Sequence, residues 1–404
     1  MLVALNVALI FVNKRLQQHP PPLLPPTLPA GQHLLTPSPL PTPENPDEGR
    51  PLPGKKRDPD TISDLDMRAY AGLPRDRVET MIDDMNDFGH AGSVFLPWVE
   101  FGPPTFKSAT VNIITDGPEF PYRISVLDPA IKVDPSWPTV KVFMLGGSTT
   151  FGSRVADEWT LASAMWNVLQ RQGSAAPHPY RVELTNWGRT WYYSSQELAL
   201  LRRLLRTGHK PDVVVFLDGL NDVNNWCTVG SDQPVFSGKL AEIYRYNQMG
   251  KDWLAQYGWI PMVRFAFLVR SHITPPPAPP ADLLTEEQVA ARAQEIVDTY
   301  QENVSDARRL CNENGIKSYF FWQPVPFVKY DLSLHRATPT VSPGIVRAFQ
   351  EVYAKIPSSV PEAVDLDDAL QQYGHKHVFV DMVHYSPDFH KFLAGLMAQH
   401  MALP

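Results

Sequence analysis

A serine hydroxyl stands directly after a strand-like run of the sequence. Residues 140–145 form a nearly continuous β-branched and apolar run, as in a strand buried on both faces. Gly146 and Gly147 precede Ser148, and the segment 159–169 has helical spacing. In an α/β fold, such a turn lifts a side chain out of the carboxyl edge of the sheet, where a hydroxyl can act as a nucleophile. The stretch is equally typical of a plain glycine turn in which Ser148 caps the next helix.

Two residues near the C-terminus could activate that hydroxyl for acyl transfer. A serine is a weak nucleophile and needs a base, and the imidazole of His384 titrates close to the operating pH. Asp381, three residues earlier, could hold this imidazole in one tautomer. The tetrahedral intermediate would also need donors to its oxyanion. The Asn221 amide and the backbone N–H groups of Ser148 and of the 188–191 loop are candidates. Each of these residues, taken alone, is more often structural.

The elements that must position these groups alternate from residue 139 onward. Strands are predicted at 139–145, 181–186, 212–218, 317–323 and 377–381, and helices at 157–172, 194–207, 285–313, 344–356 and 388–400. Such alternation predicts a parallel sheet with helices on both faces. The candidate residues each follow a predicted strand, so we expect them to meet at one edge of the sheet.

Composition and missing motifs exclude several kinds of function. The formal charge is −7, and no basic run exceeds residues 55–57, so a nucleic-acid partner is not expected. Neither G-x-x-x-x-G-K-[ST] nor G-x-G-x-x-G occurs, and no Cys/His cluster has zinc-ligand spacing, so we expect no cofactor and no metal. The absence of G-x-S-x-G disfavours the usual α/β-hydrolase arrangement. Cys227 and Cys311 could form a disulfide in an exported protein or remain unpaired apolar residues.

Four segments are predicted. Residues 1–18 begin with an apolar run shorter than the ~20 residues of a membrane span, and are a candidate membrane anchor. Residues 19–60 are a proline-rich linker, and residues 61–138, with a helix from about 74 to 87, an extension that packs on the main domain. Residues 139–404 form the main domain, whose insertion 224–284 would shape the substrate pocket. This layout favours an extracytoplasmic, membrane-tethered protein, with a cytoplasmic location as the alternative.

Four ordered blocks resemble those of the SGNH/GDSL hydrolases: Gly-Gly-Ser148-Thr-Thr-Phe-Gly, Asn186-x-Gly188, Gly-Leu-Asn221-Asp and Asp381-x-x-His384. The resemblance covers roughly residues 139–400. The Gly-Gly-Ser-Thr form of the first block is similar to that of bacterial family members with an N-terminal membrane anchor. It implies a flavodoxin-like three-layer α/β/α fold with a mainly parallel five-stranded sheet. It also implies a nucleophilic serine, a histidine base, an orienting aspartate and an asparagine oxyanion donor, at Ser148, His384, Asp381 and Asn221.

The second block departs from the family pattern. Aligned from Asn186, the family's oxyanion glycine falls on Trp191, whereas Gly188 is the other nearby glycine. A backbone N–H remains at Trp191, so both positions are candidates for the oxyanion hole. Arg154 and Arg189 could meet an anionic substrate, although a solvated surface role is favoured for each. Several aromatic residues near the site in sequence could form core or a wall for a sugar or an acyl chain: Trp187, Trp191, Tyr192, Tyr193 and Trp226.

The function expected from these residues is that of a serine esterase. Its substrate would be a carboxylic ester of a small molecule or glycan, and the esterified compound would be a carbohydrate or lipid-like. The reaction would pass through an acyl-serine intermediate and need no cofactor. The first alternative is an O-acyltransferase that passes the same acyl group to a glycan. The second alternative is a non-catalytic binding module with the same fold, which the departure at Trp191 would favour.

Overall fold

The computed structural model describes residues 66–96, 98–115, 120–229, 285–335, 343–374 and 377–403, without the side chains of 227–229. All of them belong to one compact unit, Gly54–Pro404. The predicted anchor 1–18, the linker 19–60 and nearly all of the insertion 224–284 lie outside the described residues. Within these ranges, no helix combines the length and the apolar character needed to cross a bilayer.

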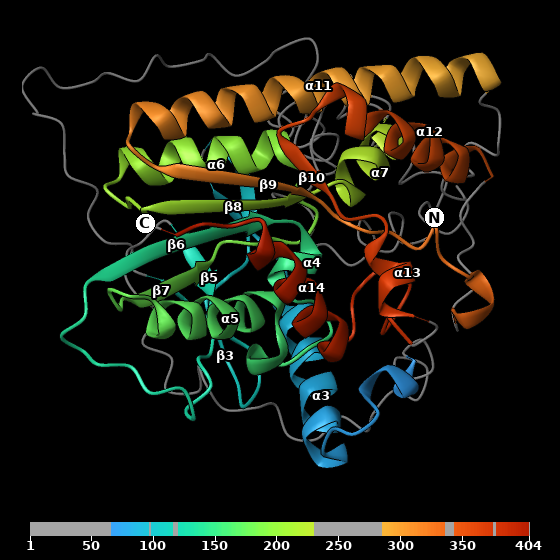
Figure 1. Cartoon of the computed structure of the whole chain (residues 1–404). Coiled ribbons are helices and arrows are strands. Elements are labelled where there is room, and N and C mark those ends of the chain that lie inside the picture. The colour runs from blue at the N-terminus through green and yellow to red at the C-terminus, as the bar shows by residue number, and fades with distance from the viewer. Residues whose placement is uncertain are drawn as a thin grey trace, which may run out of the picture. The chain divides into compact units, whose positions relative to one another are not determined.

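Eight strands of the described chain form one sheet in the order β10-β9-β8-β6-β7-β5-β4-β3 (Figure 1). Five of them are parallel: β6 (Thr139–Gly146), β7 (Arg181–Asn186), β8 (Val213–Asp218), β9 (Lys317–Trp322) and β10 (Ala363–Asp365). Three antiparallel strands extend the sheet beyond β7: β5 (Pro121–Arg123), β4 (Asn112–Thr115) and β3 (Phe106–Lys107). The mainly parallel five-stranded part confirms the predicted fold class, and the three added strands come from residues 61–138.

Helices cover both faces of this sheet and complete three layers (Figure 1). One face carries α6 (Ser194–Arg206), α7 (Leu220–Val229), α11 (Glu286–Glu313) and α12 (Pro343–Ser359). The other carries α5 (Leu161–Ala175), α13 (Ala369–Tyr373) and α14 (Pro387–Gln399). Successive residues of β8 enter opposite core clusters: Val214 and Phe216 face α6 and α11, whereas Val213 and Val215 face α5 and α14. This alternation is the period-two geometry of a strand buried on both sides.

Local sequence explains where several helices begin. At the start of α11, the Thr285 hydroxyl accepts a hydrogen bond from the Gln288 N–H, and the Gln288 side chain accepts one from the Thr285 N–H. This capping box satisfies two N–H groups that the helix cannot pair internally. The helix predicted from residue 157 begins instead with a 3-10 turn, η2 (Asp157–Trp159), because Thr160 caps a new helix at Leu161.

The fifth parallel strand is β10, and the strand predicted at 377–381 is wrong. In the described residues, that segment forms only an isolated bridge between Phe379 and Tyr385. Its residues Val378, Phe379 and Val380 are apolar because they are buried, although they do not pair with a strand of the sheet.

The described residues before β6 pack on this sheet. A helix, α3 (Arg75–Ala91), buries its predicted apolar face, including Met81 and Ile82, in a cluster that also contains Phe151. Two short strands, β1 (Val94–Leu96) and β2 (Glu100–Gly102), form a separate antiparallel hairpin. The remaining short elements are α4 (Ser148–Phe151), η1 (Met67–Tyr70) and η3 (Leu332–Leu334).

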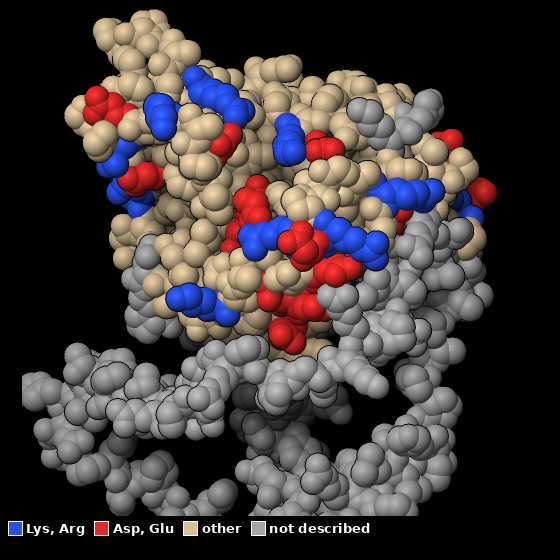
Figure 2. All heavy atoms as spheres, turned by 90° about the horizontal axis from the view of Figure 1, so that it is seen from below, with Lys and Arg blue, Asp and Glu red and all other residues tan. Residues whose placement is uncertain are grey.

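Two features bear on the predictions about a nucleic-acid partner and about the cysteines. On the face drawn in Figure 2, Asp and Glu side chains lie interspersed with Lys and Arg, so this face presents no continuous basic surface among the described residues. In the core, Cys311 is a free, buried thiol. The side chain of Cys227 lies outside what the structure describes.

Candidate active site

Ser148 is the first residue of α4, immediately after β6. Gly147 occupies the N-cap position and the helix has no side-chain cap, so the serine hydroxyl is not used for capping. Both glycines are required by space. A Cβ on Gly146 would lie 2.0 Å from Thr150 Oγ1, and a Cβ on Gly147 would lie 2.6 Å from Asn221 Nδ2. The turn therefore presents the Ser148 side chain at the carboxyl end of the central strand.

The Ser148 hydroxyl is hydrogen-bonded to the imidazole of His384. The distance from Ser148 Oγ to His384 Nε2 is 2.9 Å, across 236 positions of sequence. The other ring nitrogen, Nδ1, lies 2.8 Å from Asp381 Oδ2 and 2.9 Å from Oδ1. This network assigns the proton to Nδ1, where it is donated to the carboxylate, and leaves Nε2 to accept the serine proton. The side chains of His384 and Asp381 are each 18% exposed, so both are largely buried and retain some contact with solvent.

The turn from Asp381 to His384 holds this geometry without belonging to the sheet. The backbone N–H groups of Val383 and His384 both donate to Asp381 Oδ1, at 3.1 and 2.9 Å. The Val380 N–H donates to the His384 carbonyl, and the Asp66 N–H donates to the Val380 carbonyl. A spacing of three residues thus lets the aspartate bind both the backbone and the ring of the same histidine.

These contacts keep Asp381 ionised. Burial alone would raise its pKa, but the charge of His384 and the hydrogen bonds from His384 and Val383 outweigh burial and hold the pKa below its usual value. Arg154 adds an ion pair, with its Nε 3.8 Å from Asp381 Oδ2. Arg154 therefore lies beside the site, where only a solvated surface role had been favoured.

The loop after β7 is fastened against the serine turn at two points. The Arg189 N–H donates to the Gly146 carbonyl at 2.9 Å, and Asn221 Nδ2 donates to the Tyr192 carbonyl at 2.7 Å. Trp191 lies between these two anchors and has a positive φ of 68°. This left-handed conformation favours glycine, which agrees with the alignment of Trp191 with the family's glycine. The Trp191 side chain points outward, with 45% of its surface exposed.

Three of the four oxyanion candidates have a donor to offer. Among the described residues, no acceptor engages the N–H of Ser148 or of Trp191. Asn221 uses one amide hydrogen on the Tyr192 carbonyl, and its second has no partner in the described part of the chain. Asn221 packs against Gly147, and the loop that carries Trp191 is bonded to the Gly146 carbonyl, so both come from segments that contact the serine turn, where an oxyanion would form.

The fourth candidate, Gly188, does not have a free donor. Its N–H donates to Asn186 Oδ1 at 2.9 Å. A Cβ at this position would lie 2.4 Å from the Phe151 nitrogen, so Gly188 allows the loop to pack closely on α4. Its place in the structure is therefore that of a packing residue behind the serine turn.

The residues around the site are buried differently from what their types suggest. Arg189 is fully buried, not solvated: its guanidinium lies 5.6 Å from the ring centre of Tyr192 and donates to the Pro121 carbonyl. Trp187, Tyr192 and Tyr193 are also buried in the core. Among the described side chains of these aromatics, only Trp191 has a large exposed surface.

Gln323, after β9, is hydrogen-bonded to the serine turn. It is buried, and its Oε1 accepts a hydrogen bond from Thr149 Oγ1 at 2.7 Å. Its backbone carbonyl accepts one from the Tyr353 hydroxyl at 2.7 Å. Gln323 thus braces Thr149, the residue next to the nucleophile.

Three buried carboxyl groups, those of Asp222, Glu197 and Asp218, lie near the loop after β7. Asp222 accepts hydrogen bonds from the Ser194 hydroxyl at 2.6 Å and the Gly219 N–H at 2.9 Å, which joins the start of α6 to the turn before α7. Glu197 and Asp218 are buried beside it. Burial, together with repulsion from the neighbouring carboxylates, raises the pKa of both well above its usual value.

Wild-type stability should fall as the pH rises above about 4, where the glutamate of the unfolded chain ionises. In the Glu197→Gln variant this fall should be smaller. Because the folded pKa is raised, the folded state keeps a proton that the unfolded chain releases, so stability falls with rising pH. Glutamine does not titrate, so the difference in melting temperature, variant minus wild type, should increase between pH 5 and pH 8.

The exposed Glu295 on α11 supplies the matched control. Glu295→Gln should leave the pH dependence of the melting temperature as in the wild type. If the Glu197 and Glu295 variants change in parallel across this pH range, the buried carboxyl does not carry the effect.

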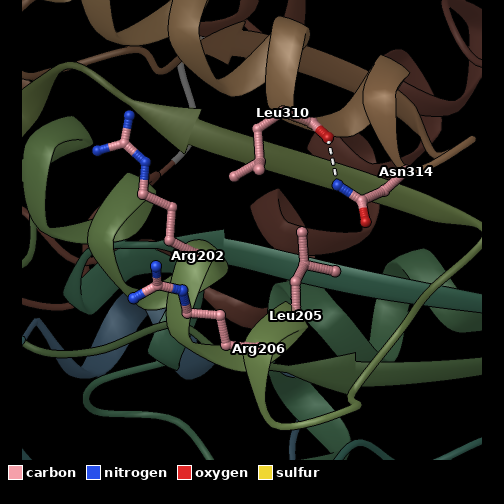
Figure 3. A pocket seen from close by; sticks show the side chains of 5 residues that line it. All are labelled: Arg202, Leu205, Arg206, Leu310 and Asn314. Atoms are coloured by element: carbon pink, nitrogen blue, oxygen red, sulfur yellow. Dashed lines mark hydrogen bonds between the residues drawn. The ribbon is translucent and has the colours of Figure 1, made fainter.

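A surface groove of about 420 Å³ lies between the last turns of α6 and α11 and is lined by Arg202, Leu205, Arg206, Leu310 and Asn314 (Figure 3). The first residue of α6, Ser194, bonds to Asp222 at the edge that carries the triad, and the groove lies at the opposite end of the same helix. The groove is therefore separate from the catalytic edge.

Residues before β6 also reach the site, which the sequence did not indicate. The Tyr192 hydroxyl contacts the carbonyls of Val99 and Phe101, at 3.1 and 2.5 Å. The β1–β2 hairpin therefore rests on the loop that carries Trp191. No motif marks the hairpin, and only its dense aromatic content could have drawn attention to it.

Comparison with known proteins gives matches among solved structures. No family model matches the sequence, and neither does any curated protein. The chain is similar to the acetyl xylan esterase AlAXEase, with 16% identity over 65% of this chain and 100% of that one and a TM-score of 0.35. It is also similar to Axe2, an acetylxylan esterase from Geobacillus stearothermophilus (12% identity, 66% and 95% covered, TM-score 0.35). A third is a member of the lipolytic protein G-D-S-L family from Veillonella parvula DSM 2008 (11%, 65% and 97%, TM-score 0.33).

These identities and TM-scores are low. The fold class therefore rests on the sheet order and layers of this chain, and the chemistry rests on the geometry of Ser148, His384 and Asp381.

Proposed function

We propose that this protein is a serine esterase that cleaves a carboxylic ester through an acyl-serine intermediate. One observation carries the proposal: an unbroken chain of hydrogen bonds runs from Ser148 Oγ to His384 Nε2, and from His384 Nδ1 to Asp381. A nucleophile, a base within bonding reach and a third group that orients the base are what acyl transfer by serine requires.

The first half of the reaction forms the acyl-enzyme. Ser148 Oγ attacks the ester carbonyl carbon while its proton moves to His384 Nε2. The ionised Asp381 stabilises the imidazolium that forms, and its lowered pKa keeps it from taking the proton. Negative charge develops on the carbonyl oxygen and is met by the N–H groups of Ser148 and Trp191 and by the Asn221 amide. The C–O bond to the alcohol then breaks, and the imidazolium returns its proton to the leaving alkoxide.

The second half releases the acid. A water molecule attacks the acyl-serine carbonyl and gives a proton to His384 Nε2. Collapse of this second tetrahedral intermediate breaks the bond to Ser148 Oγ, which recovers its proton from the imidazolium. If a sugar hydroxyl replaces water as acceptor, the same steps give O-acyl transfer to a glycan, and analysis of products with and without added glycan separates the two reactions.

A fluorophosphonate probe tests the proposal directly. The probe reacts only with an activated serine, so we expect stoichiometric labelling of the full-length protein at Ser148 and none of the Ser148→Ala variant. Mass spectrometry of the labelled peptide identifies the site. A folded wild-type protein that resists labelling would favour the non-catalytic binding module instead.

A further inference from the structure

The β1–β2 hairpin, described at residues 94–96 and 98–102, exposes two large aromatic side chains. Trp98 is 80% exposed and Phe95 is 68% exposed, whereas Val99 and Phe101 of the same hairpin are buried. Large aromatic side chains with most of their surface in water are unusual in a folded protein unless they contact something else. The buried residues anchor the hairpin, and the exposed ones are presented outward.

A single tyrosine connects this hairpin to the catalytic turn. The Tyr192 carbonyl lies 3.0 Å from the position of a Cβ on Gly147, the residue before the nucleophile. The hydroxyl of the same tyrosine contacts the carbonyls of Val99 and Phe101, and the Phe101 ring packs edge-to-face on the tyrosine ring at 5.4 Å. Tyr192 therefore joins the serine turn, through its carbonyl, to the backbone of Val99, the residue after Trp98, through its hydroxyl. Trp191 is the chain neighbour of the same tyrosine.

The backbone holds both exposed tryptophans in a strained conformation. Trp98 has φ 74° and Trp191 has φ 68°, in the left-handed region that bulky residues rarely adopt. Such a conformation is unfavourable for a residue with a Cβ and tends to be found where function requires it. A glycine would relieve it at either position, yet a large aromatic ring is present at both.

The exposure of these rings indicates the shape of the ligand. An acyl chain gains affinity by being enclosed on several sides, and a ring that is mostly in water covers only one side of its ligand. The hairpin contains Glu100 and no Lys or Arg, which disfavours binding to an anionic bilayer. A sugar ring fits better, because its flat C–H face can stack on an indole while its hydroxyl groups stay in water.

We propose that the β1–β2 hairpin, described at residues 94–96 and 98–102, is a glycan-binding platform, on which a pyranose ring of the substrate stacks against Trp98. The inference rests on the proposed esterase function and assigns its substrate class as carbohydrate esters. The sugar that carries the scissile ester would lie at Ser148, and a neighbouring part of the glycan would lie on Trp98.

The test compares two substrates in wild-type protein and in Trp98→Ala: acetylated xylo-oligosaccharides and p-nitrophenyl acetate. The quantity is the ratio of kcat/KM for the oligosaccharide to kcat/KM for the small ester. A lost aromatic stack predicts that this ratio falls about five- to tenfold, mainly through KM. Trp98→Phe keeps a planar ring and should retain most of the ratio, and Ile114→Ala, an exposed apolar residue on β4, should keep all of it.

Several outcomes would overturn the platform while leaving the esterase intact. One is an unchanged ratio in Trp98→Ala, and another is a fall of the ratio in Ile114→Ala as large as that in Trp98→Ala. Cleavage of p-nitrophenyl acetate without any cleavage of acetylated oligosaccharides is a third. A comparable loss on p-nitrophenyl palmitate would assign the hairpin to acyl chains. If neither p-nitrophenyl acetate nor p-nitrophenyl palmitate is cleaved in a Ser148-dependent way, the proposed esterase function itself fails. This outcome is distinct from failure of the platform alone.

Discussion

Ser148→Ala is expected to lower kcat/KM for p-nitrophenyl acetate by at least ~10⁴-fold, which corresponds to about 5.5 kcal/mol of transition-state stabilisation. The hydroxyl is the only atom of this residue that bonds to His384 among the described contacts. Without it no acyl-enzyme can form, and the oxyanion donors can act only on a direct attack by water. Residual turnover should therefore stay close to the rate that binding alone supports.

The change should leave the fold intact, because Ser148 does not cap α4 and its side chain makes no other hydrogen bond within the described residues. Melting temperatures should agree to within a few degrees. Ser136→Ala, in an exposed loop before β6, is the matched control and should retain wild-type turnover. If Ser148→Ala kept more than a tenth of the activity, the acyl-serine mechanism would be wrong.

Arg123→Met is expected to destabilise the protein by about 3–5 kcal/mol, the usual effect of breaking a buried ion pair on one side. The Arg123 side chain is completely buried and its Nε lies 2.9 Å from Asp157 Oδ1. Its other nitrogens donate to the carbonyls of Phe151, Gly152 and Val155, at the end of the helix that starts with Ser148. Methionine would leave a buried carboxylate and three carbonyls without this donor.

Urea denaturation at neutral pH measures the loss as a lower midpoint at an unchanged slope. Arg75→Met removes an exposed pair with Glu79 on α3 and should change stability by less than about 0.5 kcal/mol. Because Arg123 also fixes the end of α4, activity should fall together with stability. The double variant Arg123→Met, Asp157→Leu should recover part of the loss, since no buried charge then remains unpaired. Equal losses for the Arg123 and Arg75 variants would contradict the role assigned to the buried pair.

The order of strands and helices could be predicted because it depends on local patterns. The apolar run before Gly146 became the central strand β6, and the capping box at Thr285 became the start of α11. Hydrophobic period and helix caps act over a few residues, so they can be read without the rest of the molecule. Residue type and chain order also singled out Ser148, Asp381 and His384 as candidates, although a distance between them could not be deduced.

The partner of each element was decided by the tertiary structure. The run at 378–380 and the short strand β10 both look apolar, but hydrogen bonding to β9 selected residues 363–365. Arg189 is charged and yet fully buried, because the β1–β2 hairpin covers it. Burial depends on which surfaces meet, and those surfaces come from segments far apart in the chain.

By itself, the sequence determined a parallel α/β core and the residue types that could transfer an acyl group, since both follow from local periodicity and from side-chain chemistry. Only the tertiary structure decided that Ser148 and His384, 236 positions apart, lie 2.9 Å from each other, and that Val99, next to Trp98, contacts the side chain of Tyr192 in the loop after β7. Such contacts are set by long-range packing, which closes loops that no local pattern encodes.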